Sequence, residues 1–348
     1  MRCDVIPDRR PYSVNLEVTL ACNLRCKHCG ASAGRARRDE LTLEEWRACF
    51  GDLARLGCEE ACLLGGELLV RNDWEELCRG VGDAGLRLVI ITNGWSVDSG
   101  VVSILAGLSV NRIGVSLDAA TPAVHDEIRG REGSHARALA ALYALRDAGL
   151  ETGAITTLSR DNLHELPKLR DLFLGQDITW QIQTAALGGE RFEGDRRLDR
   201  QEFYNVGRFI AECRAAHSVD ELPIAGSHDL GYHSAVFGHV GELREWTGCG
   251  AGLYTLGITS DGHVKGCLSQ HEDFIEGNIR DRPLEDLWND PALFQRNRCF
   301  TTEQLKGFCK VCPHGSTCRA GCSNVAYTST GRLFDNPFCF YRIEEEGA

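Results

Sequence analysis

The amino-acid sequence predicts an α/β fold in which an open, partial barrel of six strand–helix units is followed by a small, loop-rich, cysteine-rich domain. Strand and helix patterns alternate from about residue 13 to residue 218, as in parallel sheets whose crossover connections are helices. Polar segments, several of them with glycine, follow the predicted strands. After residue 220 the predicted elements become shorter, and eight cysteines occur between residues 249 and 339.

The first unit begins with residues 13–19, where polar and apolar side chains alternate as in a half-buried strand. Thr42 and Glu45 form a capping box that predicts a helix start. Apolar residues then recur at helical spacing: Leu43, Trp46, Cys49, Phe50, Leu53 and Leu56. Further strands are predicted at 61–64, 86–92, 112–118, 151–158 and 178–184. Further helices are predicted from about Asp73 and over 98–107, 121–129, 134–148, 162–174 and 199–217.

Six units are too few to close an ordinary eight-stranded barrel, so the pattern predicts a partial (β/α)6 TIM-like barrel. Parallel sheets bind ligands at the carboxyl ends of their strands. The polar segments predicted there are Gly65-Gly66-Glu67, Thr92-Asn93-Gly94, Ser116-Leu117-Asp118 and Gln181-Ile182-Gln183, together with a cysteine loop after the first strand. Polar clusters at five strand ends predict one ligand site at this edge of the sheet.

Three cysteines lie within eight residues of that first loop: Cys22, Cys26 and Cys29. Thiolates so close together cannot all pair as disulfides, but they can bind three irons of one four-iron cluster. Three protein ligands leave one iron open, and an open iron is a place to bind a cofactor or a substrate.

Composition narrows the class of protein. The 348-residue chain has 17 cysteines, no run of eighteen apolar residues and no signal-peptide pattern, so we expect a soluble cytoplasmic protein without a membrane partner. Disulfide frameworks belong to short secreted chains, so clustered cysteines here indicate metal. The net charge is −12 and no long basic run is present, so no nucleic-acid partner is expected. The acidity is explained by solubility or by a cationic substrate.

The cysteine loop resembles the signature of the radical S-adenosylmethionine (radical SAM) superfamily, with His28 at the usual aromatic position. Gly65-Gly66-Glu67 resembles the Gly-Gly-Glu-Pro motif of that family, with Leu68 in place of proline. The resemblance implies that Cys22, Cys26 and Cys29 hold a catalytic [4Fe–4S] cluster whose fourth iron binds S-adenosylmethionine. Reductive cleavage of this cofactor then gives a 5′-deoxyadenosyl radical that abstracts hydrogen from a substrate C–H.

The same resemblance implies contacts with S-adenosylmethionine. The backbones of Gly65 and Gly66 would approach the methionine moiety, and Glu67 would accept from its ammonium group. Ser116 would bind the ribose and Arg129 would pair with the carboxylate, unless Arg129 is an exposed arginine at a helix end. Asn93 and Gln183 are further candidates near the cofactor.

The C-terminal cysteines resemble those of the SPASM domain, which carries auxiliary iron–sulfur clusters, and a zinc ribbon is the alternative for Cys309 and Cys312. By family pattern one cluster has four ligands: Cys309, Cys312, Cys318 and Cys339. The other has three: Cys249, Cys267 and Cys322. The fourth iron of this cluster would be open, or its ligand would be a substrate or one of Asp229, His228, His233 and His239. The expected domains are 13–218 (radical SAM), 219–248 (linker) and 249–342 (SPASM).

The resemblance implies an oxidoreductase with three [4Fe–4S] clusters, whose auxiliary clusters accept a second electron from the substrate. We expect a ribosomally made peptide or a protein side chain as substrate, with a flavodoxin or ferredoxin as electron donor. The cysteine loop begins too early for a fused peptide-recognition domain, which favours a small-molecule substrate unless a separate protein recognises the peptide. The alternatives are oxidation, epimerisation or decarboxylation of a small cationic natural product such as an aminoglycoside or aminocyclitol, and a non-catalytic electron-transfer protein.

Overall fold

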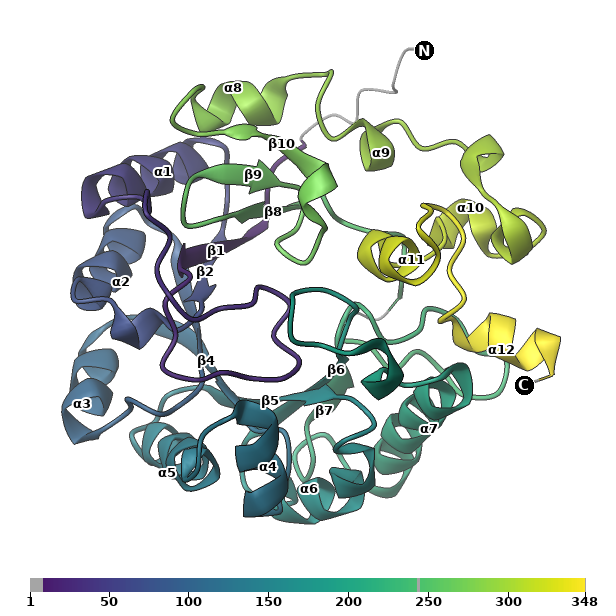
Figure 1. Cartoon of the computed structure of the whole chain (residues 1–348), viewed down its shortest axis with the longest axis horizontal. Helices are drawn as coiled ribbons and strands as arrows, with labels where there is room; N and C mark the ends of the chain where they lie inside the picture. The colour runs from purple at the N-terminus through teal and green to yellow at the C-terminus, as the bar shows by residue number, and fades with distance from the viewer. Residues whose placement is uncertain (1–8, 243–244, 348) are drawn as a thin grey trace.

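A computed structural model of the chain describes residues 9–242 and 245–347. Six parallel strands follow one another in sequence and in space, and helices lie outside them (Figure 1). The strands are β1 (Ser13–Thr19), β2 (Glu60–Gly65), β3 (Arg87–Thr92), β4 (Val110–Ser116), β5 (Thr152–Leu158) and β6 (Thr179–Thr184). The helices are α1 (Leu43–Arg55), α2 (Trp74–Asp83), α3 (Ser99–Gly107), α4 (Pro122–Arg129), α5 (Ser134–Asp147), α6 (Leu166–Phe173) and α7 (Arg200–Ala216). The prediction of an α/β fold of mostly parallel strands is confirmed.

Helix α1 shows how local sequence fixes an element. Thr42 accepts a hydrogen bond from the Glu45 backbone, and the Glu45 side chain accepts one from the Thr42 backbone, so the predicted capping box is present. The helix buries Trp46, Cys49, Phe50 and Leu53. These side chains join the core between the sheet and its outer helices.

The C-terminal part adds strands to the same sheet, which the sequence analysis did not anticipate. Strand β7 (Ile224–Gly226) pairs in parallel with β6, and β8 (Thr255–Ile258) pairs in parallel with β1. Strands β9 (His263–Lys265) and β10 (Ile275–Asn278) continue antiparallel from β8. The sheet therefore has the order β10-β9-β8-β1-β2-β3-β4-β5-β6-β7. Pairing with β8 and β7 covers the edges that β1 and β6 would otherwise expose.

Short helices complete the C-terminal part: the first lies beside α1 and β10, and the others lie on the side of the ring between β8 and α7 (Figure 1). They are α8 (Leu284–Asn289), α9 (Gln295–Arg298), α10 (Gly315–Cys318), α11 (Ser323–Thr330) and α12 (Phe340–Glu346). In the described part of the chain, no helix has the length and apolar character needed to cross a membrane.

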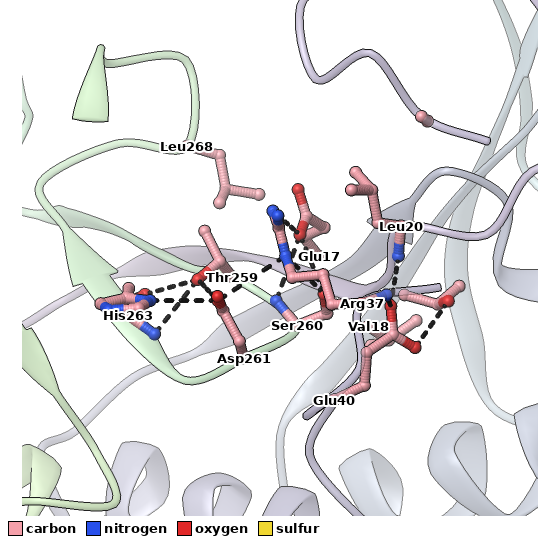
Figure 2. Close-up of polar contacts among 12 residues, drawn as sticks. Glu17, Val18, Leu20, Arg37, Glu40, Thr259, Ser260, Asp261, His263 and Leu268 are labelled. Atoms are coloured by element: carbon pink, nitrogen blue, oxygen red, sulfur yellow. Dashed lines mark hydrogen bonds and ion pairs between the residues drawn. The ribbon is translucent and has the colours of Figure 1, made fainter. Parts of the chain in front are cut away.

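A buried polar network joins β1 to the turn between β8 and β9 (Figure 2). Glu17 of β1 is only 6% exposed, and its Oε1 accepts from Arg37 Nη2 at 2.7 Å. The same oxygen accepts from the backbone and side chain of Ser260, at 3.2 and 3.1 Å. Arg37 Nε donates to Ser260 Oγ and lies 3.7 Å from Asp261 Oδ1. The segment after the cysteine loop is thereby fixed to the C-terminal strands.

Candidate active site and cluster loops

The cysteine loop lies at the carboxyl end of β1 and is tied to other elements by backbone hydrogen bonds. Arg25 and Lys27 donate their backbone N–H groups to the carbonyls of Arg129 and Ile128, at 3.1 and 2.8 Å. Cys22 donates its backbone N–H to Gly34 at 3.3 Å. The end of α4 therefore sets the position of the loop.

The three thiols of this loop are held in different surroundings. Cys26 is 9% exposed, whereas Cys22 and Cys29 are half-buried. The sulfur of Cys22 accepts from the Leu24 backbone at 3.4 Å, and that of Cys29 from the Ala33 backbone at 3.3 Å. Burial raises the pKa of Cys22 to about 11 and also raises that of Cys26, although the Arg129 guanidinium opposes the second shift. Iron would supply the positive charge that favours the thiolates.

Gly65 and Gly66 pack directly against the start of the cysteine loop. A Cβ atom at Gly65 would lie 2.3 Å from the Thr19 carbonyl oxygen, and one at Gly66 would lie 2.2 Å from that of Ala21. Gly66 N donates to Thr19 O at 2.7 Å, and Glu67 N donates to Ala21 O at 2.8 Å. The close approach that the glycines permit in this structure is between two protein backbones.

Glu67 is 1% exposed, and its carboxylate connects the segment after β2 to the end of β3. Oε1 accepts from Thr92 Oγ1 at 2.8 Å and from Leu69 N at 3.1 Å, and Oε2 accepts from Asn93 N at 2.7 Å. Burial raises the pKa of Glu67, and these hydrogen bonds oppose the rise. Since each carboxylate oxygen has two acceptor sites, Oε2 retains capacity for a further donor.

Asn93 reaches from the end of β3 to the cysteine loop. Its Nδ2 donates to Asn23 Oδ1 at 2.8 Å and lies 3.8 Å from Cys22 Sγ. Asn93 is 8% exposed. The structure thus brings Glu67 and Asn93 together beside Cys22.

Arg129 is buried, at 6% exposed, so the alternative of an exposed helix-end arginine is wrong. Its Nε lies 2.6 Å from Asp118 Oδ2, and since that N–H lacks hydrogen-bond geometry the contact is ionic. Its Nη1 lies 3.8 Å from Cys26 Sγ. Arg129 therefore places a positive charge against the thiol of the cysteine loop that is most buried.

Asp118, His28 and His125 lie with Arg129 in one buried polar cluster, for which no ligand role was predicted. Asp118 Oδ2 lies 2.8 Å from His28 Nε2, and the Asp118 backbone donates to His125 Nδ1 at 3.1 Å. Burial acts to raise the pKa of Asp118, but the charges of Arg129 and His28 outweigh it and lower that pKa well below its usual range. Burial and Arg129 together lower the pKa of His125 to about 3, so its imidazole is neutral at pH 7. The sequence feature that could have indicated this cluster is the position of Asp118 at the end of a predicted strand.

Ser116 and Gln183 lie on the same edge of the sheet, and Thr157, which accepts from Gln183, donates its backbone N–H to Asp118 Oδ1 at 3.0 Å. Ser116 is the last residue of β4 and is half-buried. Gln183 of β6 donates from Nε2 to Thr157 Oγ1 at 2.8 Å. Neither residue has a recorded hydrogen bond to the cysteine loop among the described residues, so their predicted roles depend on a cofactor that spans the strand ends.

The loop after β6 lies beside the cysteine loop over the mouth of the ring (Figure 1). Arg191 donates to three carbonyls there: Cys26 at 3.1 Å, Ser32 at 3.3 Å and Ala33 at 3.0 Å. No periodic pattern or motif in the sequence predicts a role for Arg191. Its hydrogen bonds join two loops that are far apart in the chain.

The four thiols predicted as one auxiliary set line a single pocket that is partly open to solvent. They are Cys309, Cys312, Cys318 and Cys339. Phe308, Tyr232 and Tyr341 also line the cavity, so its wall is largely apolar. Four thiols around one cavity fit a [4Fe–4S] cluster, whose ligands bind different irons.

The set of three thiols lies next to the segment that follows β7. Cys249 and Cys267 interact electrostatically with His228, and Cys322 interacts with Asp229. His233 lies elsewhere: it stacks on His314 at 4.2 Å between ring centroids and lines the four-thiol cavity. Of the four non-cysteine candidates, His228 and Asp229 are thus beside the three-thiol set.

Comparisons with known proteins agree with this geometry. The Radical SAM superfamily model matches residues 16–173, and the SPASM iron–sulfur cluster-binding domain model matches residues 249–313. The AdoMet-dependent heme synthase of Methanosarcina barkeri is 31% identical over 346 residues, 95% of this chain and 97% of the relative. The chain belongs to the radical SAM superfamily. It is a radical SAM enzyme with a C-terminal SPASM domain, so the electron-transfer alternative is wrong.

Further relatives and solved structures fit the same family. The mycofactocin maturase MftC of Mycobacterium ulcerans is 29% identical over 333 residues, 94% of this chain and 86% of the relative. Streptococcus suis SuiB bound to S-adenosylmethionine has a TM-score of 0.76 at 19% identity, covering 95% of this chain and 77% of SuiB. Native anSMEcpe with AdoMet and a peptide has a TM-score of 0.70 at 18% identity, covering 96% and 94%. The two structures show the fold, and the two domains indicate iron–sulfur clusters and S-adenosylmethionine as cofactors.

Proposed function

We propose that this enzyme is an oxidoreductase with three [4Fe–4S] clusters, one catalytic and two auxiliary. When bound and reduced, the catalytic cluster and S-adenosylmethionine supply a 5′-deoxyadenosyl radical that takes a hydrogen atom from a substrate C–H. The observation that carries the proposal is the position of Cys22, Cys26 and Cys29 at the strand ends, with Glu67, Asn93 and Arg129 against them.

The residues of the chain would bind and orient the catalytic cluster and S-adenosylmethionine and would shield them from water. The three thiols would hold three irons and leave the fourth for the amino and carboxylate groups of S-adenosylmethionine. Glu67 would accept from the ammonium group with the free acceptor site on Oε2, while Ser116 and Gln183 would contact the cofactor farther along the strand ends. Arg129 would offset negative charge beside Cys26, and Arg191 would hold the two loops together over the site.

For the substrate we favour a ribosomally made peptide or a protein side chain. The support is the relative named mycofactocin maturase, which is matched over 94% of this chain. The C-terminal cysteines would hold the auxiliary clusters, which when bound would supply an acceptor for the electron that the substrate loses after hydrogen abstraction. A separate electron, needed to reduce the catalytic cluster, would come from a flavodoxin or ferredoxin. A separate recognition protein would deliver the peptide.

A second candidate substrate is an iron-containing tetrapyrrole. It is favoured by the AdoMet-dependent heme synthase at 31% identity and by the Fe-coproporphyrin III synthase of Methanosarcina barkeri at 26% identity over 366 residues. The small cationic natural product remains a third candidate on the acidity of the chain alone.

The proposed chemistry is tested by anaerobic reconstitution with iron and sulfide, reduction and addition of S-adenosylmethionine. We expect 5′-deoxyadenosine, at a rate that rises with the true substrate. A precursor peptide, iron coproporphyrin III and an aminocyclitol are compared as substrates, each deuterated at the expected carbon. Deuterium in the 5′-deoxyadenosine identifies the substrate, and absence of 5′-deoxyadenosine with intact clusters would refute the proposal.

The ligand assignment is tested by replacing Cys22, Cys26 and Cys29 with alanine together. We expect loss of 5′-deoxyadenosine and of about four irons per chain, with about eight auxiliary irons retained. Alanine at Cys49, which is buried in α1, is the matched control and should retain about twelve irons. Cofactor cleavage by the triple variant would show that the catalytic cluster is elsewhere.

A further inference from the structure

The three-thiol set formed by Cys249, Cys267 and Cys322 has one protein ligand fewer than a four-iron cluster has irons. The inference below rests on the proposed function, in which this set of thiols holds an auxiliary cluster that needs a fourth ligand. The segment 227–230, directly after β7, supplies two polar side chains that interact with it, His228 and Asp229. This segment is anchored by Ser227 N, which donates to Ile182 O at 2.7 Å.

Asp229 carries a buried carboxylate of which only one oxygen has a partner. The residue is 7% exposed. Its Oδ2 accepts from Thr184 N at 2.7 Å and from Thr184 Oγ1 at 2.5 Å. Its Oδ1 is buried and has no hydrogen-bond partner among the described residues. Buried carboxylate oxygens without a partner are costly, so they are found where a cation or a donor binds.

Asp229 lies in the neighbourhood of Cys322, one of the three thiols. The negative charge of Asp229 acts on the Cys322 thiol and on the Tyr232 hydroxyl. Tyr232 packs with Cys322, and Cys249 is packed against the same apolar cluster. Thr184 fixes Oδ2 through two hydrogen bonds and thereby fixes the orientation of Oδ1.

We propose that Asp229 Oδ1 is the fourth protein ligand of the auxiliary cluster held by Cys249, Cys267 and Cys322. A carboxylate oxygen is an accepted iron ligand, and iron would satisfy the acceptor that the protein leaves open. The bond forms by donation of an oxygen lone pair to iron and requires no electron transfer.

The other non-cysteine candidates fit less well. His228 is exposed, and its Nδ1 lies 3.1 Å from Ser227 Oγ. His233 lines the four-thiol cavity. His239 is half-buried, and a Cβ at Gly241 would lie 2.6 Å from its Nε2, so its ring packs on its own loop. None of the three combines near-complete burial with an open acceptor beside Cys322.

The test uses the full chain in which Cys22, Cys26 and Cys29 are alanine, so that only auxiliary iron is observed. Asp229→Ala and Asp229→Cys are compared with His228→Ala as the matched control. The readouts are iron content, Mössbauer spectra, EPR spectra of the reduced clusters and their midpoint potentials. For Asp229→Ala we expect loss of about one iron of four from one cluster, with a three-iron EPR signal on oxidation. Asp229→Cys should retain all four irons but shift the g-values and the potential of that cluster, and His228→Ala should change neither.

Two outcomes would overturn the inference: unchanged spectra for both Asp229 variants, or a change that follows His228→Ala instead. If Asp229→Ala does not yield folded protein, the spectra of Asp229→Cys decide alone. Failure of the proposed function has a different signature. In that case, replacing Cys249, Cys267 and Cys322 with alanine would leave the auxiliary iron content unchanged.

Discussion

Asp118 and Arg129 form an ion pair inside the protein, with 2.6 Å between Asp118 Oδ2 and Arg129 Nε. Their side chains are 0% and 8% exposed. The pair joins the end of β4 to the end of α4, and the Arg129 guanidinium continues to Cys26 Sγ at 3.8 Å. A buried charge pair of this kind positions its members strictly, because neither charge can be left alone without a large cost.

Replacing Asp118 with asparagine is expected to destabilise the enzyme by about 3 to 5 kcal/mol, because it leaves the Arg129 charge buried without a carboxylate. Anaerobic urea unfolding measures the effect. Asp147→Asn is the control, since Asp147 pairs with Arg146 but its side chain is 65% exposed, and we expect a change below about 0.5 kcal/mol. Equal stability of the two variants would show that the Asp118–Arg129 pair does not hold the end of α4 in place.

Gly66→Ala is expected to displace the cysteine loop, because the new Cβ would lie 2.2 Å from the Ala21 carbonyl oxygen. Backbone cannot move away as a flexible side chain would, so we expect about 1 to 3 kcal/mol of destabilisation and loss of iron from the catalytic cluster alone. Iron analysis and urea unfolding measure the two effects.

Gly82→Ala is the matched control for Gly66→Ala. Gly82 lies on the exposed face of α2, and a Cβ there would meet no atom within 4 Å. Alanine should stabilise α2 by about 0.5 to 1 kcal/mol and leave the iron content unchanged. If both variants retain full iron, the packing of Gly66 against the loop is not needed for cluster binding.

The six strand–helix units could be predicted because their signals are local. The alternating strand over residues 13–19 and the capping box of Thr42 and Glu45 depend on residues close together in sequence. The pairing of β8 with β1 could not be predicted, since β8 has only four residues and its partner is more than 200 residues away. A short segment becomes a strand there because β1 offers an unpaired edge.

The candidate site divides in the same way. Glu67 and Asn93 follow neighbouring parallel strands, so their position at one edge of the sheet could be predicted from the sequence. The partner of Arg129 could not be predicted, because an arginine at the end of a helix is exposed in most proteins. Here the cysteine loop covers the end of α4 and buries Arg129. Arg191 was missed for a similar reason, since its three carbonyl acceptors belong to a loop about 160 residues earlier in the chain.

Arg37→Ala is expected to weaken the contact between β1 and the turn at 259–263, because Glu17 would keep a buried charge with only Ser260 as donor. We expect about 3 kcal/mol of destabilisation and faster hydrogen exchange in that turn. Hydrogen-exchange mass spectrometry measures the local effect. Adding Glu17→Gln to Arg37→Ala should recover part of the loss, because the amide carries no charge.

Arg38→Ala is the control for this network, since Arg38 is exposed. It should leave both stability and exchange in the turn unchanged. If Arg38→Ala accelerates exchange as much as Arg37→Ala does, the effect comes from general loss of positive charge and not from the network of Figure 2.

Cys78, on the buried face of α2, should make stability fall at alkaline pH. It is 1% exposed, and burial raises its pKa from 9.0 to about 12. Between these values the unfolded chain has lost the thiol proton while the folded chain retains it. Folding stability therefore decreases by about 1.4 kcal/mol per pH unit above pH 9.

The measurement compares the native sequence with Cys78→Ala by urea unfolding at pH 8 and at pH 10.5. At pH 8 the variant should be less stable by about 1 kcal/mol, because burial of the sulfur is lost. By pH 10.5 the difference should shrink by about 2 kcal/mol and reverse, since alanine has no proton to lose. The other cysteines and the clusters contribute equally to both proteins and cancel in the difference. A constant difference across this range would contradict the prediction, because it would mean that the Cys78 thiol titrates alike in the folded and unfolded chains.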